Sequence, residues 1–168
     1  MEPQVEPMTP LEKVQWMLDQ HGWGVEPVPG APEPPPPRPG YSYTFGLEAL
    51  VGHPEIVIFG LAPVAAQGLL VLAVDHLRLG GHIPENEPFV GLLAGSLRAV
   101  LVPVERARHQ GLFPTLPLIY GDQPWRVTQF VWPDRNGSLP WEEGWPEQLR
   151  LVQPVLGRNG PDPAPPDR

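Results

Sequence analysis

The stretch that decides the fold is GHPEIVIFGLAPVAAQGLLVLAVDHLRLGG, residues 52–81. Its first part, Glu55 to Leu61, is apolar on both faces of an extended chain, which predicts a central strand covered on each side. Pro63 suits the first turn of a helix that continues to Leu79 and ends at the following glycine pair. We expect this helix to be well buried across the sheet. The residues at the centre of its expected buried face are Ala65, Leu69, Leu72, His76 and Leu79, flanked by Ala66, Leu70, Ala73 and Leu77.

Other strands are predicted on both sides of this stretch. Residues 41–47 alternate apolar and polar, which predicts a half-buried strand, antiparallel to the central one because the connection is short. Residues 87–104 form a predicted hairpin around Ala94-Gly95-Ser96. Residues 125–132 alternate again and predict a further strand, followed by a turn at Asp134-Arg135-Asn136-Gly137.

The remaining segments have clear local signals. Thr9-Pro10-Leu11-Glu12 combines a capping box with a proline at the first helical position, so a helix should run from there to about residue 21. Residues 23–28 are predicted to form a short edge strand. Residues 29–40 must form a loop because proline fixes φ and lacks an N–H donor. Residues 110–121 predict a short broken helix, interrupted by two prolines.

These elements predict an α+β protein with a mainly antiparallel sheet, packed by one long buried helix and an N-terminal helix. The expected organisation is a flexible N-terminus over residues 1–7, a single domain over 8–157 and a disordered tail over 158–168. The proline-rich loop 29–40 has two interpretations, a ligand for an aromatic-lined groove or an expanded surface loop.

Composition restricts the function. The net charge of −8, from 19 acidic and 11 basic residues, disfavours nucleic acid as a partner. The absence of cysteine excludes disulfides, thiolate nucleophiles and cysteine-ligated metal sites. No signal peptide or membrane-spanning stretch is recognisable, so we expect a cytoplasmic protein that does not bind membranes.

Three phrases carry a family resemblance: YSYTFGL at 41–47, HPEIVIFGL at 53–61 and QFVWPDRNGSLPW at 129–141. They resemble a bacterial family known as domain of unknown function 4262, whose members share a YT-x-GL, HPE and GL opening and a late Q-x-x-WPD-x-x-G-x-x-PW element. The resemblance covers roughly residues 41–157. It implies a small single-domain protein without an established activity.

The phrase His53-Pro54-Glu55 is the first candidate for chemistry. An imidazole and a carboxylate two positions apart lie on one side of an extended chain, where they could bind a metal ion or share a proton. The alternative is that Pro54 fixes a turn while His53 and Glu55 bond to the backbone. A zinc or iron site assembled from His53, Asp75, His76 and His82 is conceivable, but no second ligand set is placed by the sequence, so we predict no metal and no cofactor.

The late element gathers three tryptophans, Trp132, Trp141 and Trp145, around an aspartate-containing turn. Asp134 and Arg135 could serve as polar contacts on an aromatic platform for a peptide, a sugar or a flat ligand. In the alternative, Asp134 caps its own turn by accepting from backbone N–H groups. Trp132 and Trp141 would then pack across a hairpin.

The sequence therefore favours a non-catalytic domain that binds a small molecule or a protein. Its groove is expected where residues 43–46, 53–55 and 129–141 converge. The alternative is a small metal-assisted hydrolase that uses His53, Glu55 and Asp134. A homodimer remains open. The predicted binding residues are Tyr43, Thr44, His53, Glu55, Gln129, Trp132, Asp134, Arg135 and Trp141.

Overall fold

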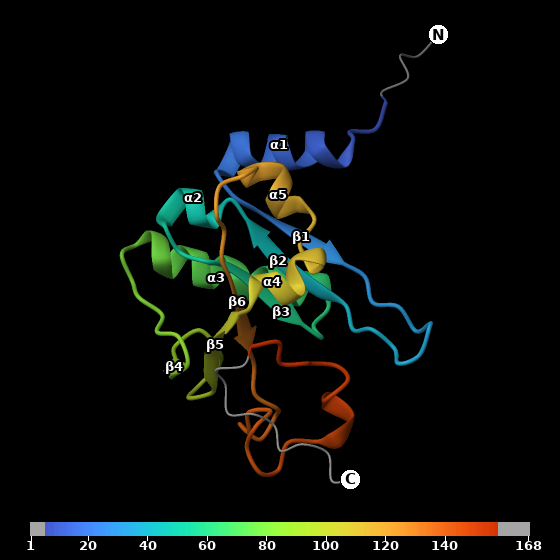
Figure 1. Cartoon of the computed structure of the whole chain (residues 1–168). Helices are drawn as coiled ribbons and strands as arrows, with labels where there is room; N and C mark the ends of the chain where they lie inside the picture. Colours follow the sequence, from blue (N-terminus) through green and yellow to red (C-terminus); the bar gives the residue numbers. More distant parts are fainter. Residues whose placement is uncertain (1–5, 158–168) are drawn as a thin grey trace.

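A six-stranded mixed sheet with helices on both faces forms the fold of the computed structural model, which describes residues 6–157 (Figure 1). Residues 1–5 of the predicted flexible N-terminus and all of the predicted tail lie outside the described residues. The strands are β1 (Gly24–Val28), β2 (Tyr41–Phe45), β3 (Glu55–Phe59), β4 (Pro88–Val90), β5 (Arg98–Val104) and β6 (Val127–Val131). The helices are α1 (Pro10–His21), α2 (Leu47–Val51), α3 (Pro63–Arg78), α4 (Arg106–His109) and α5 (Thr115–Tyr120), with 3-10 turns η1 (Gln110–Leu112) and η2 (Glu147–Leu149).

The spatial order of the strands is β1-β2-β3-β6-β5-β4. The predicted antiparallel pairing of β2 with β3 is confirmed, with Tyr41 opposite Phe59. The predicted hairpin is also present as the antiparallel pair β4 and β5. The sheet is mixed because β3 and β6 run parallel, with Glu55 opposite Val127. Local turn signals could not predict this pairing, since about 70 residues separate the two strands in sequence.

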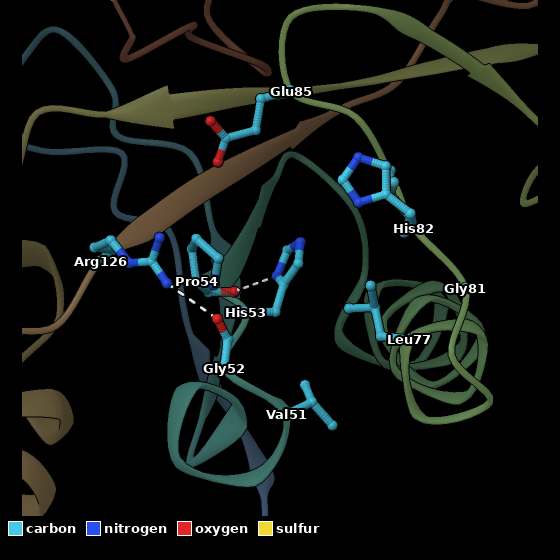
Figure 2. Close-up of a pocket in the computed structure, with 10 residues that line it drawn as sticks. Val51, Gly52, His53, Pro54, Leu77, Gly81, His82, Glu85 and Arg126 are labelled. Carbon is cyan, nitrogen blue, oxygen red and sulfur yellow. Dashed lines mark hydrogen bonds between the residues drawn. The ribbon is translucent and has the colours of Figure 1, made fainter.

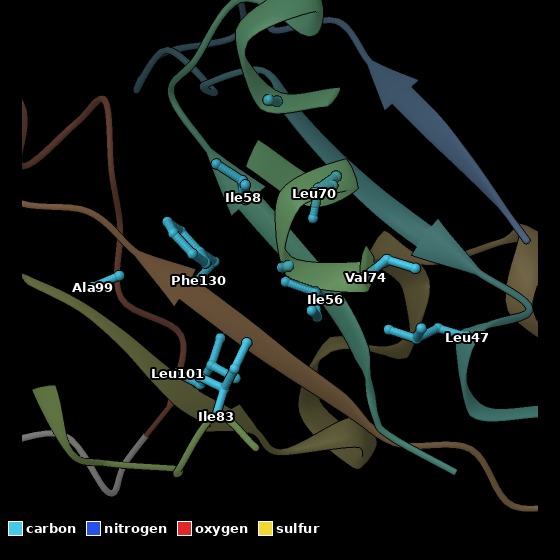
Figure 3. Packing of buried hydrophobic residues seen from close by; sticks show 11 residues of the cluster. Leu47, Ile56, Ile58, Leu70, Val74, Ile83, Ala99, Leu101 and Phe130 are labelled. Carbon is cyan, nitrogen blue, oxygen red and sulfur yellow. The ribbon is translucent and has the colours of Figure 1, made fainter. Parts of the chain in front are cut away.

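The central strands alternate their side chains between two buried faces. One face carries Ile56, Ile58 and Phe130 against α3, as Figure 3 shows. The other face carries Tyr43 and Val57 against α1, α5 and the segment before β6. The prediction that β2 would be half-buried is therefore wrong, because β2, like β6, is covered on each side by helices or connecting segments.

Helix α3 packs on the sheet as expected, but mainly through residues that were predicted to flank the buried face and not through the predicted centre of that face. Its buried residues are Ala66, Leu70, Ala73 and Val74. Leu72 and Leu79, predicted to be buried, are 51% and 89% exposed. A helix with apolar residues nearly all round has no single face marked by periodicity. Ala66 and Ala73 point to the physical reason, since small side chains let a helix approach a sheet closely.

Other predictions from short sequence patterns are confirmed. Thr9 and Glu12 form the predicted capping box at the start of α1. Strand β1 is at the edge of the sheet. The broken helix predicted over residues 110–121 is present as η1 and α5, and the short helix α4 that precedes it was not predicted. Within residues 6–157, no helix combines the length and the apolar character needed to cross a bilayer.

Gly60 directly follows β3, and the backbone of the C-terminal segment packs closely against it. Its φ is +82°, and a Cβ atom there would lie 2.6 Å from both the carbonyl oxygen and a methyl group of Val152. We expect Gly60→Ala to lower the free energy of unfolding by about 2 kcal/mol, measured by urea denaturation. The matched control is Gly68→Ala in α3, where a Cβ meets nothing within 4 Å. The control should be neutral or stabilising, because alanine is the better helix former, and equal losses in both variants would contradict the packing explanation.

Candidate functional site

Glu55 is the most connected polar side chain in the core. It is fully buried at the start of β3, and its carboxylate accepts hydrogen bonds from four donors. Oε1 accepts from Thr44 Oγ1 at 2.9 Å and from the Leu47 N–H at 3.0 Å. Oε2 accepts from the Glu48 N–H at 3.1 Å and from the Tyr120 hydroxyl at 2.5 Å. The carboxylate therefore ties β2, α2 and α5 to the central strand.

Burial and hydrogen bonding act in opposite directions on this carboxyl group. Burial raises the pKa of Glu55 to about 7, while the bonds from Tyr120, Glu48, Thr44 and Leu47 oppose the rise. The pKa of the Tyr120 hydroxyl is also raised, first by burial and then by the charge of Glu55. Glu55 has no exposed surface, so its four donors rather than a ligand occupy it. We assign it a positioning role.

The element that Glu55 positions leads directly into a pocket. Helix α2 ends at Gly52, and the following residues His53 and Pro54 line a cavity of about 520 Å³ (Figure 2). Other walls come from the end of α3 and from the segment between α3 and β4. The polar side chains of the lining are His53, His82, Glu85 and Arg126, and the apolar ones include Val51, Pro54, Leu77 and Ile83.

One ring nitrogen of His53 is engaged and the other is directed toward the cavity. Nδ1 lies 2.7 Å from the Pro54 carbonyl oxygen, which can only accept, so Nδ1 carries the proton in this bond. Nε2 is then the unprotonated acceptor of the neutral ring, and it is directed into the space between Glu85 and His82 (Figure 2). Burial lowers the pKa of His53, opposed by the Pro54 bond and the charge of Glu85. The ring is thus neutral near pH 7.

The two charged side chains of the pocket differ in their engagement. Arg126 donates from Nε to Glu48 at 2.8 Å and from Nη2 to the Gly52 carbonyl at 3.0 Å. Its charge is therefore compensated by Glu48, and it holds the turn at the end of α2. Glu85, by contrast, is an exposed residue whose side chain has no hydrogen bond or ion pair within the described part of the chain, and it lines the pocket (Figure 2).

The structure does not bring Asp134 to His53 and Glu55. Strand β3 separates Glu55 from Phe59 by four residues, about 13 Å, and the Phe59 carbonyl accepts from Trp132 Nε1 at 2.8 Å. The segment that follows β6, which includes Asp134, leaves the sheet at the end opposite α2 (Figure 1). No single site can therefore contain all three residues of the predicted hydrolase. The strands of the family-like phrases are adjacent in the sheet. The polar side chains of His53 and Glu55, however, lie at one end of these strands, and Asp134 lies at the other.

The turn-capping interpretation of Asp134 is confirmed. Its Oδ1 accepts from the backbone N–H groups of Asn136 at 2.9 Å and Ser138 at 2.8 Å. Trp132 does not pack on Trp141. Its ring lies 5.9 Å from that of Trp145 instead. Trp132 packs in the cluster beneath α3, while Trp141 packs with Val100, Val102 and Val131 on the other face of the sheet.

The other predicted binding residues lie in the interior or at the surface away from the pocket. Tyr43, Thr44 and Gln129 have no exposed surface. The Gln129 side chain donates to the Pro154 carbonyl at 2.7 Å and accepts from the Leu156 N–H at 2.9 Å, so it fastens the C-terminal segment to β6. Arg135 is exposed in the turn.

A metal centre has no visible ligand set in residues 6–157. No group of three or more histidine, aspartate or glutamate side chains there lies close enough to hold an ion. His76, weighed as a ligand, instead packs edge-on against Phe89 at 5.4 Å. Its Nε2 is buried, and no hydrogen-bond partner is found for it in the part of the chain that the structure describes.

Sequence reasoning missed three residues of the site: Tyr120, Glu85 and Arg126. Tyr120 and Arg126 approach α2 only in the folded chain, from more than 60 residues away. Glu85 had a weak signal, because His82-Ile83-Pro84-Glu85 resembles the earlier His53-Pro54-Glu55 phrase.

The family model described as Domain of unknown function (DUF4262) matches residues 17–146. The chain belongs to this family. No curated protein and no solved structure matches the chain. The DUF4262 match includes Glu55, its donors and every residue that lines the pocket. The C-terminal segment fastened by Gln129 lies outside the matched residues.

Proposed function

We propose that this chain is a non-catalytic domain that binds a small polar molecule in the pocket beside His53. The observation that carries the proposal is the state of the His53 ring. Nδ1 is fixed by the Pro54 carbonyl, which leaves Nε2 as an oriented acceptor in a cavity of about 520 Å³. A concave pocket with an apolar wall and a few convergent polar groups is typical of ligand sites.

The support beneath the pocket fits a binding role. Glu55 fixes the N-terminal end of α2, and Arg126 fixes its C-terminal end through Gly52. His53 follows immediately, so its ring is held before any ligand arrives. Preorganisation of this kind reduces the entropy lost on binding.

The test is a thermal-shift screen of the full chain with small amines, alcohols, carboxylates and phosphates. At least one compound should raise the melting temperature, because a ligand at 100 times its Kd stabilises the native state by about 2.7 kcal/mol. His53→Ala should weaken that ligand at least about tenfold, since it removes the oriented acceptor.

The matched control is His109→Ala, because His109 lies outside the lining of the pocket. This variant should bind the same compound as the unmodified chain does. Equal binding by the His53→Ala variant would contradict the proposed site. A screen in which no compound raises the melting temperature would contradict the proposed function.

A further inference from the structure

Among the described residues, the side chains that line the pocket offer more free hydrogen-bond acceptors than donors, and a ring N–H of His82 is one of those donors. His53 Nε2 is an acceptor because Nδ1 holds the ring proton. Glu85 adds a carboxylate, which accepts only. The two groups come from different segments, yet both line the same pocket (Figure 2). A ligand that satisfies both must supply hydrogen-bond donors.

The charges of the side chains around the pocket also favour a ligand that donates hydrogen bonds. Arg126 is its one guanidinium, and this group is already paired with Glu48 and bonded to Gly52. Glu85 has no compensating partner within residues 6–157. The charge of Glu85 also acts more strongly on the His53 ring than that of Arg126, in the direction that favours a positive charge there. A cation is therefore favoured over an anion at this position.

An organic cation fits better than a metal ion. The described residues contain no cluster of three metal-binding side chains. An ammonium group has three N–H donors, so acceptors on two side chains can bind it without the larger ligand set that a metal ion requires. The apolar wall formed by Val51, Leu77 and Ile83 can cover a short hydrocarbon body next to it.

We infer that the ligand of this pocket is a primary amine with a short hydrocarbon chain, whose ammonium group is bound between Glu85 and Nε2 of His53. The inference rests on the proposed function, because it names the chemical class that the same pocket selects. Glu85 is the specificity-determining residue, and His53 orients the bound group.

The experiment is an NMR titration of the ¹⁵N-labelled full chain with three probes of similar size: n-butylamine, n-butanol and butyrate. We expect n-butylamine to shift the amide signals of residues 51–54 and 82–85 in a saturable way. The alcohol should bind more weakly, and butyrate should not shift these signals. Glu85→Gln should weaken n-butylamine binding about tenfold, because a hydrogen bond to a charged group is replaced by a neutral one.

The matched control is Glu87→Gln, which makes the same change of net charge at an exposed position outside the pocket lining. It should leave binding unchanged. If butyrate or butanol binds as tightly as the amine, or if Glu85→Gln binds the amine normally, the ligand class is wrong while the pocket remains a binding site. If none of the probes shifts the pocket signals, both the inference and the proposed function fail.

Discussion

Replacing Glu55 by alanine is expected to lower the free energy of unfolding by about 4 kcal/mol. The change removes an acceptor that serves four donors, from Thr44, Leu47, Glu48 and Tyr120. A buried donor left without a partner costs about 1–3 kcal/mol. The cavity left by the side chain adds to the loss. Urea denaturation, followed by circular dichroism at pH 7, measures the effect.

Two further variants make this prediction specific. Glu55→Gln keeps the side-chain volume and one carbonyl acceptor, so it should lower the free energy of unfolding less than Glu55→Ala does. It should still lower it, because the new NH₂ group faces hydrogen-bond donors. Glu87→Ala removes an exposed carboxylate and should change stability by less than about 0.5 kcal/mol. A loss below about 1 kcal/mol in Glu55→Ala would contradict the role of this carboxylate in joining β2, α2 and α5.

The same carboxyl group should make the protein less stable as the pH rises from 4.5 to 7. In the unfolded chain Glu55 has its ordinary pKa of 4.5, whereas burial raises the pKa to about 7 in the folded protein. Between these values the folded state keeps a proton that the unfolded state has lost. The contribution of the protonated Glu55 carboxyl group to the free energy of unfolding is complete below pH 4.5 and is lost as the pH rises through 7. The difference is on the order of 3 kcal/mol.

Other carboxylates also titrate in this range, so the measurement compares the unmodified chain with Glu55→Gln. The free energy of unfolding of the two proteins should differ most at pH 4.5, and the difference should narrow by on the order of 3 kcal/mol by pH 7.5. A difference that widens with pH would mean that the four hydrogen bonds outweigh burial and keep Glu55 ionised.

Much of the fold follows from local sequence. The capping box at Thr9 and Glu12, the apolar run of β3 and the glycine pair after α3 each have a physical cause within a few residues. The buried face of α3 did not follow, because its apolar residues surround the helix. The parallel pairing of β3 with β6 did not follow either, since it depends on contacts between distant segments.

The candidate site was predicted in part. The phrase at His53 was identified as a place for chemistry, and its backbone-anchoring alternative fits the bonds that the structure contains. Trp132, Asp134 and Trp141 were placed with it on the expectation that the family-like phrases meet at one point. The family-like phrases contain adjacent strands, but their polar side chains lie at opposite ends of those strands and are therefore far apart.

The sequence by itself determined α1, α3 and the strands, because capping, periodicity and turn chemistry act over a few residues, and its phrases identified the family. It did not predict α2, the short helix that leads to His53. Only the tertiary structure decided which residues surround His53. Glu85 and Arg126 reach the pocket, and Tyr120 reaches Glu55, through the packing of segments that lie tens of residues apart. The physical reason is that hydrogen bonding and burial depend on proximity in space. No local pattern encodes that proximity.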